Sequence, residues 1–240
     1  MVTFNIEVIS DPICSWCFIA HRALERTIRL YRTTIPNGSA DIFNVTYLPY
    51  YLLDPTLPSR DKTDLQGVIT PRKHQNITYT RITQIGRSYG ILFNFLDGKI
   101  GGTREVHRLI QLAQSRKSSE IRDRVLDNVS GAFHERAMDI TDRGILRSIA
   151  IDAGVDTVEA DEWMDKDKDV GSKELQIQLE RARDLIGTNK GVPVVIVQGK
   201  YRFDGAPDVS ELLGTLAGIR DGRLPEEKDK MQEHTSCNAC

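Results

Sequence analysis

The sequence predicts an α/β fold in which a small β-α-β … β-β-α domain is interrupted by a large inserted helical domain. Strand patterns occur near both ends of the chain, helical patterns fill the middle, and a Cys-x-x-Cys motif falls between the first strand and the first helix. We therefore expect residues 1–53 and 188–222 to form the two parts of the α/β domain. Residues 54–187 form the predicted insertion, and residues 223–240 a predicted mobile C-terminal tail.

The first element is a predicted buried strand from Thr3 to Ser10, where apolar and polar residues alternate. Asp11-Pro12 ends this strand, and apolar residues then recur at helical spacing from Cys14 to about Tyr31. A turn-rich stretch leads to a second predicted strand, from about Ile42 to Leu48. A strand, a helix and a strand in this order predict two parallel strands joined by a right-handed crossover.

Helices are predicted throughout the insertion, from capping residues and apolar periodicity. Thr70-Pro71 begins the first one, which extends to Gly90. Thr103 begins the second, and Gly187 ends the last. The other predicted helical ranges are Ser119–Ala137, Thr141–Ala153 and Val170–Ile186.

Strand patterns return after the insertion. Val192–Val197 is a short apolar run, Gly199-Lys200 predicts a turn, and Tyr201–Phe203 begins the returning strand of a hairpin. Asp208 is a typical N-cap for a last helix over Val209–Ile219. The order β-β-α therefore completes the predicted α/β domain.

The composition is that of an ordinary globular protein, with 40% hydrophobic and 28% charged residues. Since 32 basic residues oppose 34 acidic ones, bulk charge attracts neither nucleic acid nor an anionic membrane. No apolar run reaches the roughly 20 residues that span a bilayer. The N-terminal residues lack the pattern of a secretory signal, so we expect a cytoplasmic protein with no nucleic-acid or membrane partner.

The cysteines form two Cys-x-x-Cys pairs, Cys14/Cys17 and Cys237/Cys240. A thiolate at the start of a helix faces free backbone N–H groups and the positive end of the helix dipole, which should lower the pKa of Cys14. In this register we expect Cys14 to be the exposed attacking thiol and Cys17 the more buried resolving thiol. Zinc sites use the same spacing, but the junction of strand and helix favours redox chemistry, and we predict no metal.

Gly191-Val192-Pro193 places a proline at the head of a predicted strand, where a missing N–H is tolerated. Together these features resemble the DsbA-like thioredoxin proteins, and the run Ser10–Ile19 resembles their FrnE-like branch, whose members carry Cys-Pro-Trp-Cys. The stretches 103–113, 133–154 and 191–205 also resemble that branch. The resemblance covers roughly residues 3–219, and the architecture is shared with kappa-class glutathione transferases and hydroxychromene-carboxylate isomerases.

The resemblance implies a thioredoxin-like fold and a role for each site residue. Cys14 matches the nucleophile, Cys17 the resolving cysteine and Pro193 the cis-proline beside the disulfide. The backbone of Val192 would pair with an extended substrate, and Glu7 lies where the group often carries an acid beneath the disulfide. No tightly bound cofactor is implied, and glutathione as a co-substrate stays open.

Ser15 is a departure, since the branch usually has proline there. The two residues between the cysteines tune the reduction potential, so oxidant, reductase and isomerase roles all stay open. Trp16 is expected on the rim of the site, where it favours apolar substrates, unless it packs against the insertion.

Two histidines and a basic helix face have functional and purely structural interpretations. His21 follows Cys17 by one helical turn, where it would modulate the pKa of the thiols, but a solvated surface position is the stronger expectation. His107 matches a family position that either lines the substrate cleft or forms a hydrogen bond between helices. Arg72, Lys73, Arg81 and Arg87 recur along one predicted helix, and a solvated face is expected there.

Cys237 and Cys240 have three interpretations. They form a relay that exchanges disulfides with Cys14 and Cys17, a four-thiolate zinc site with them, or a tail with incidental thiols.

The leading hypothesis is a thiol-disulfide oxidoreductase acting on a protein or a small molecule. One alternative is a small-molecule tailoring enzyme on the same scaffold, resembling an isomerase or a glutathione transferase. Another is a non-catalytic binding or chaperone module. The sequence leaves the oligomeric state undetermined, with a homodimer among the possibilities.

Overall fold

The chain begins with the parallel β-α-β unit that the sequence predicts. In the computed structural model, which describes residues 1–64, 75–165, 167–187 and 191–223, β1 (Thr3–Ser10) pairs in parallel with β2 (Ile42–Pro49). The connection is α1 (Ser15–Thr34) followed by a short 3-10 turn, Gly38–Ala40. β5 (Val194–Val197) runs antiparallel to β1, and β6 (Tyr201–Asp204) antiparallel to β5.

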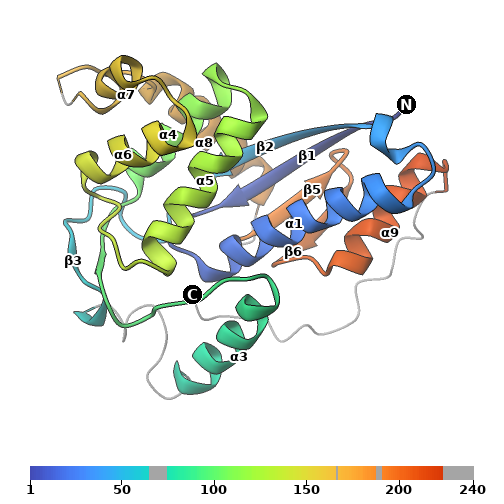
Figure 1. Ribbon diagram of the computed structural model, residues 1–240, viewed down its shortest axis with the longest axis horizontal. Helices are drawn as coiled ribbons and strands as arrows, with labels where there is room; N and C mark the ends of the chain where they lie inside the picture. The colour runs from blue at the N-terminus through green and yellow to red at the C-terminus, as the bar shows by residue number, and fades with distance from the viewer. Residues whose placement is uncertain (65–74, 166, 188–190, 224–240) are drawn as a thin grey trace.

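These strands form one sheet in the order β2-β1-β5-β6, covered by helices on both faces. α1 packs against α9 (Val209–Arg220), and the two lie side by side over the face shown in Figure 1. α8 (Ser172–Ile186) packs on β2 and covers the other face. Because side chains alternate along a strand, Val8 lies in the core with α1 and α9 while Ile9 packs with α8. This is the β-α-β … β-β-α arrangement that the sequence predicts.

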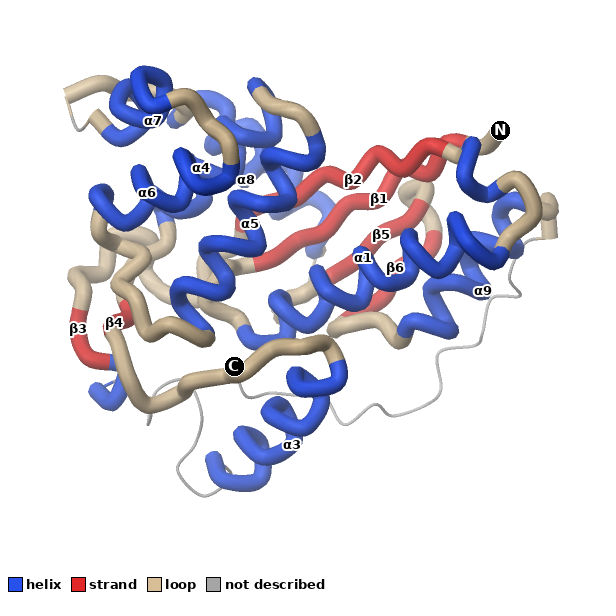
Figure 2. The backbone as a smooth tube through the Cα atoms, viewed as in Figure 1, coloured by secondary structure: helices blue, strands red, loops and turns tan. Residues whose placement is uncertain are grey.

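The segment between β2 and β5 is helical, as predicted, with one small addition. Arg60–Asp61 (β3) and Lys99–Ile100 (β4) pair as a two-stranded sheet. α3 lies beside the first turns of α1, apart from the other helices (Figure 2). The helices before α8 are α3 (Gln75–Ser88), α4 (Arg104–Arg116), α5 (Ser119–His134), α6 (Arg143–Ala153) and α7 (Thr157–Met164).

The predicted helix boundaries differ from the observed ones where a local cap decides. Asp142 caps α6 by accepting hydrogen bonds from the backbone N–H groups of Gly144 and Ile145, so this helix begins after Thr141. Asp156 caps α7, a short helix that periodicity did not predict. The predicted start of the first insertion helix, Thr70-Pro71, lies outside the described residues. Asp208 caps α9 as predicted.

The outer edge of β2 is covered by side chains of the insertion. The backbone N–H of Tyr47 donates to Gln114 Oε1 at 2.7 Å, and its carbonyl oxygen accepts from Gln111 Nε2 at 3.0 Å. The Arg122 guanidinium donates to the Val45 carbonyl oxygen. An edge strand otherwise exposes unpaired backbone groups, so α4 and α5 complete the sheet on this side.

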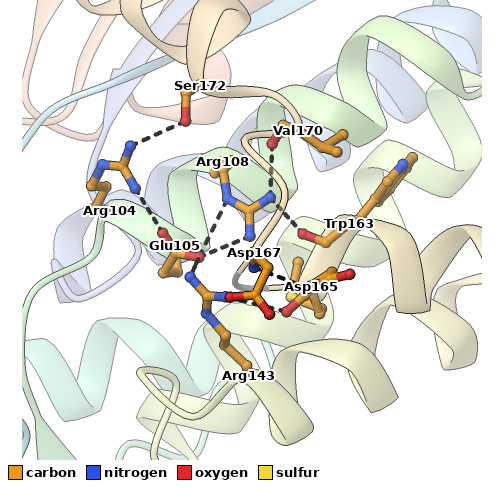
Figure 3. Close-up of polar contacts among 10 residues, drawn as sticks. Arg104, Glu105, Arg108, Arg143, Trp163, Asp165, Asp167, Val170 and Ser172 are labelled. Carbon is orange, nitrogen blue, oxygen red and sulfur yellow. Dashed lines mark hydrogen bonds and ion pairs between the residues drawn. The ribbon is translucent and has the colours of Figure 1, made fainter.

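A buried arginine of α4 binds the segment between α7 and α8. Arg108, 3% exposed, donates to Glu105 and to the carbonyl oxygens of Trp163 and Val170 (Figure 3). Arg143 from α6 also pairs with Glu105, at 3.0 Å. The segment between α7 and α8 is thereby held against α4.

One hydrophobic core runs through the sheet and the insertion. Phe4, Ile6 and Val8 of β1 belong to the same cluster of buried residues as Leu109 of α4 and Val125 of α5. The predicted boundaries at 53/54 and 187/188 therefore separate elements that pack together. None of the described helices is long and apolar enough to cross a membrane.

Candidate active site

The Cys-x-x-Cys motif lies at the carboxyl end of β1 and opens α1. A turn brings the Cys14 N–H to the Asp11 carbonyl oxygen at 3.0 Å, and extended backbone at Cys14 makes this residue the N-cap. The Cys14 carbonyl oxygen then accepts from the N–H groups of Cys17 and Phe18, which begins the helix. Ser15 is the first helical residue. The Cys14 thiol thus sits where free backbone N–H groups and the helix dipole favour a negative charge.

The second predicted element, Val192-Pro193, lies directly against Cys14. The Cys14 thiol donates to the Val192 carbonyl oxygen, with Sγ and O 3.6 Å apart. The peptide bond between Val192 and Pro193 is cis, and the Pro193 carbonyl oxygen accepts from the Gly205 N–H at 2.8 Å. Cys14 and Val192 are 178 positions apart in the sequence, and the fold brings them into contact.

The expected difference in exposure between the two thiols is wrong. Cys14 is 2% exposed and Cys17 6%, so both are buried, and both are free thiols. The physical reason is a cover of apolar side chains around the pair: Trp16, Tyr50, Leu52 and Leu185 pack on the cluster that holds both cysteines. A substrate must displace part of this cover to reach Cys14 Sγ.

Asp11 is a site residue that the sequence pattern predicts only as the end of a strand. Its side chain is fully buried, and its carboxylate accepts from the N–H groups of Leu52 (2.8 Å) and Ile13 (3.3 Å). The Thr103 hydroxyl adds a hydrogen bond at 3.4 Å. Burial outweighs these bonds and raises the pKa of Asp11 to about 7. A buried acid with a raised pKa, three residues before Cys14, is a candidate acid-base group.

His107 is buried, 2% exposed, behind the segment that follows β2. Its Nε2 lies 2.9 Å from the Tyr50 carbonyl oxygen, and its ring meets the Tyr51 ring edge-on. Burial lowers the pKa of His107 to about 4. It is therefore neutral near pH 7, and its approach of 3.8 Å to Asp11 is not a salt bridge. Its partner is a loop carbonyl oxygen and not another helix, while a role in the substrate cleft stays a prediction.

The expectation that His21 is a solvated surface residue is wrong. His21 is 3% exposed, because α5 and β2 cover this face of α1, and its Nδ1 lies 2.8 Å from the Tyr47 hydroxyl. Burial lowers the pKa of His21 to about 3, so the ring is neutral. His21 borders a small cavity behind the dithiol. The cavity is lined by Val8, Ser10, Asp11, Pro12, Cys17, Phe18, His21, Tyr47, Leu126 and Ser130.

Glu7 of β1 has a charged partner on α8. Its carboxylate forms an ion pair with Arg181 of α8. Neighbouring side chains of a strand point to opposite faces, so Glu7 shares the α8 face with Ile9, whereas Val8 points toward α1. Its role beneath the disulfide stays a prediction.

Trp16 packs against the cysteine cluster on one side and against the apolar cluster between α1 and α3 on the other. The Arg81 guanidinium lies over its ring, 5.9 Å from the centroid. Trp16 is therefore partly buried and contacts the insertion through α3, while its role at the rim of the site stays a prediction. Arg81 and Arg87 are exposed.

Several predictions fall on residues that the structure does not describe. Arg72 and Lys73, and the pair Cys237 and Cys240, lie outside the described ranges, so the three interpretations of the second pair stay open. Within the part of the chain that is described, no three His, Cys, Asp or Glu side chains group as metal ligands.

Comparison with known proteins gives one family and a set of similar folds. The family model "DSBA-like thioredoxin domain" matches residues 5–217. No curated protein matches the chain.

Among solved structures, a probable DsbA oxidoreductase from Streptomyces coelicolor is similar with a TM-score of 0.77, at 21% identity over 92% of both chains. A 2-hydroxychromene-2-carboxylate isomerase is similar at 0.61, with 12% identity over 91% of this chain and 98% of the other. The cytosolic disulfide reductase DsbM from Pseudomonas aeruginosa, solved with glutathione, is similar at 0.55, with 14% identity over 91% and 96%. At these identities the likeness is one of fold.

Proposed function

The chain belongs to the DSBA-like thioredoxin domain family, and on this premise we propose that it is a thiol-disulfide oxidoreductase of the FrnE-like branch. The observation that carries the proposal is the position of Cys14. Cys14 is the N-cap residue of α1, and its thiol donates to the Val192 carbonyl oxygen, directly before Pro193. In this place one thiolate is stabilised while the neighbouring backbone can pair with an extended substrate.

The proposed reaction has two exchange steps. The Cys14 thiolate attacks one sulfur of a substrate disulfide, which forms a mixed disulfide and releases the other substrate sulfur as a thiolate. Cys17 then attacks the Cys14 sulfur, closes the Cys14–Cys17 disulfide and releases the second substrate thiolate. The substrate disulfide gains two electrons and the protein dithiol loses them. The same steps in reverse oxidise a substrate dithiol.

The substrate class includes both proteins and small molecules, with glutathione as the proposed co-substrate and no tightly bound cofactor. The DsbM structure that shares this fold was solved with glutathione and is named a cytosolic reductase, which supports both this choice and a cytoplasmic location. The apolar cover of Trp16, Tyr50, Leu52 and Leu185 favours substrates with apolar groups beside the disulfide.

A second candidate is an isomerase-like tailoring enzyme for a small molecule. Its support is the shared fold with the 2-hydroxychromene-2-carboxylate isomerase. The two candidates differ in their need for sulfur. Isomerase-type turnover that survives replacement of both Cys14 and Cys17 would favour this second function over the first.

An insulin-reduction assay tests the leading proposal. The wild-type chain should reduce insulin disulfides with dithiothreitol or glutathione as electron donor. Cys14→Ser should lower the rate at least about 100-fold, because a serine hydroxyl is not ionised near pH 7 and cannot exchange with a disulfide.

A matched series assigns the activity to the first pair. The same comparison is made in a Cys237→Ser/Cys240→Ser background, where only Cys14 and Cys17 remain. Equal rates for this chain and its Cys14→Ser form would rule out the oxidoreductase assignment. Binding of an apolar protein without any thiol turnover would favour a chaperone module.

A further inference from the structure

The three stretches of chain that meet around Trp16 carry basic residues and no acidic ones. Trp16 packs there in one apolar cluster with side chains of α1, α3 and residues 91–96. Neither α3 nor residues 91–96 nor the first half of α1, Ser15–Leu24, contains an aspartate or a glutamate, although the chain has 34 acidic residues. An anion that approaches this side of the dithiol therefore meets a positive local potential. The charged residues of these stretches are Arg22, Arg81 and Arg87.

Arg81 is the member of this group that lies over Trp16. Arg22 pairs with Asp127 of α5 at 2.7 Å. Arg81 is exposed, and within the described part of the chain it forms no ion pair with a carboxylate. Its guanidinium lies over the Trp16 ring, 5.9 Å from the centroid. The ring attracts the cation without using its N–H groups, so the donors of Arg81 stay available for a ligand.

Trp16 connects Arg81 to the reactive thiol. It packs on the cluster that holds both cysteines, and it lies beneath the Arg81 guanidinium. A ligand that displaces the apolar cover to reach Cys14 is therefore one aromatic side chain away from a cation. The other apolar side chains of this cover offer no charge: Tyr50, Leu52 and Leu185.

We propose that Arg81 binds a carboxylate of the substrate, and that the substrates are small disulfides with a carboxylate near the sulfur atoms. This inference rests on the proposed oxidoreductase function. Arg81 donates hydrogen bonds to the carboxylate, while the indole of Trp16 contacts the apolar part of the substrate beside the disulfide. Arg81 makes no bond to sulfur, so the two exchange steps at Cys14 and Cys17 are unchanged. Arg81 acts on binding and thereby on specificity.

The surroundings of Cys14 favour a small anionic disulfide over a folded protein. Cys14 is 2% exposed, so a bulky group beside the substrate disulfide must displace more of the apolar cover than a slender one. A guanidinium presents paired N–H donors that match the two oxygens of a carboxylate. Because Arg81 is exposed, water and salt screen such a pair, and its expected contribution to the rate is about fivefold.

Two aromatic disulfides that differ in charge test the inference. 5,5′-Dithiobis(2-nitrobenzoate) carries a carboxylate on each ring, whereas 4,4′-dithiodipyridine is uncharged at pH 7, and both release a coloured product. Their rate constants for the first exchange with Cys14 are measured by stopped flow in a chain with Cys237→Ser and Cys240→Ser. In Arg81→Gln we expect the ratio of the two rate constants, benzoate over pyridine, to fall about fivefold. The ratio cancels any effect of the substitution on the reactivity of the Cys14 thiolate.

Arg87→Gln is the matched control, because Arg87 is also an exposed arginine of α3, six positions further along. Its ratio should stay within about 1.5-fold of the parent. Arg81→Glu reverses the charge at Trp16 and should lower the ratio further than Arg81→Gln does. A ratio that changes less than about twofold in Arg81→Gln, or that falls as far in Arg87→Gln, would overturn the inference while the proposed function stands.

Glutathione disulfide and its ethyl ester form a second pair of substrates that differ in their carboxylates. Formation of the mixed disulfide on Cys14 is followed by mass spectrometry in the Cys17→Ser chain, with and without Arg81→Gln. We expect Arg81→Gln to slow the reaction of the free acid more than that of the ester. A fall for the benzoate pair alone would identify an aromatic acid as the substrate, and falls for both pairs would include glutathione.

The salt dependence of the chain with Arg81 intact covers the case in which the Arg81 variants fail to fold. Raising the ionic strength from about 0.01 M to about 0.5 M should lower the ratio of benzoate to pyridine rate constants, because screening weakens the contact with the guanidinium. A ratio that does not respond to salt would contradict the inference. If the chain reacts with both reagents no faster than its Cys14→Ser form, the proposed function is overturned, and the inference with it.

Discussion

Asp11, His21, His107 and His134 are single residues whose charge is decided by burial. Each is at most 3% exposed. Burial raises the pKa of Asp11 to about 7 and lowers the pKa of His134 to about 3. The pKa of the acid rises and the pKa values of the histidines fall, because desolvation disfavours the charged form of each group. The three histidines are therefore neutral near pH 7, whereas Asp11 titrates in that range.

The burial of His134 makes the free energy of unfolding depend on pH. Its Nε2 lies 2.9 Å from the Pro12 carbonyl oxygen, and its ring stacks on Phe18. A histidine with a depressed folded pKa contributes stability above about pH 6.5, and this is lost as pH falls toward 3. Urea unfolding at pH 7 and pH 5 should show that His134→Gln loses about 1–2 kcal/mol less than the wild type over this interval. Equal losses in the two proteins would contradict the assignment.

The shifted pKa of Asp11 changes stability with pH in the opposite direction to that of His134. A raised folded pKa means that its contribution is fully present below about pH 4 and is lost as pH rises through 7. Relative to the wild type, Asp11→Asn should therefore become more stable by a few kcal/mol, on the order of 2–4, between pH 4 and pH 8. Chemical denaturation at both pH values measures this difference. A constant difference across the interval would show that Asp11 titrates normally.

The sequence predicts the reactive residues at this scale better than their surroundings. Cys14, Cys17 and Val192-Pro193 lie together as expected, because motif and strand order determine their places. Asp11 could not be recognised in this way. Its carboxylate is hydrogen-bonded by Leu52 and Thr103, which are 41 and 92 positions further along the chain. Exposure of Cys14 was mispredicted for the same reason, since distant apolar residues cover it.

At the scale of elements, the predicted strands and most predicted helices are observed, because alternation and caps are local signals. Local signals also explain the errors. α7 is only Thr157–Met164, too short for a clear apolar period, and an Asp142 cap delays the start of α6. The covering of β2 by polar side chains of α4 and α5 has no local signal at all.

Gln114 tests how much this covering stabilises the sheet. Gln114→Ala removes the acceptor of the buried Tyr47 N–H and one donor to the Tyr47 carbonyl oxygen. We expect a loss of about 1–3 kcal/mol in the free energy of unfolding, the range for an unsatisfied buried donor. Gln176→Ala is the control, because Gln176 donates to Glu180 on the exposed face of α8, and it should change stability by less than about 0.5 kcal/mol. Equal effects of the two changes would contradict the edge-covering role.

At the scale of the whole molecule, the insertion and the α/β elements are joined by one core and by buried polar contacts. Phe4 and Leu109 share a cluster although they belong to different predicted domains. Gln114 and Gln111 of α4 add hydrogen bonds to the Tyr47 backbone of β2. Within the insertion, Arg108 links α4 to the segment between α7 and α8 (Figure 3). We therefore expect the described parts to unfold as one unit.

Arg108→Met tests how much the buried contacts of Arg108 stabilise the protein. It keeps the side-chain volume but removes the donors to Glu105, Trp163 and Val170, so we expect destabilisation of about 3 kcal/mol or more. Arg116→Met is the control on the same helix, since Arg116 forms a half-exposed ion pair with Glu174 of α8 at 3.2 Å. That pair should contribute less than about 1 kcal/mol. Thermal and urea unfolding measure the stability of both variants. Similar small losses of stability would show that the Arg108 contacts are not needed.

The most direct test of the oxidoreductase assignment is mass spectrometry of the trapped intermediate. Cys17→Ser keeps the attacking thiol but cannot resolve the mixed disulfide. After incubation with glutathione disulfide, we expect one glutathione adduct on Cys14 that dithiothreitol removes, and none at that site in Cys14→Ser/Cys17→Ser. An unmodified Cys14, with adducts confined to Cys237 and Cys240, would contradict the assignment of Cys14 as the attacking thiol.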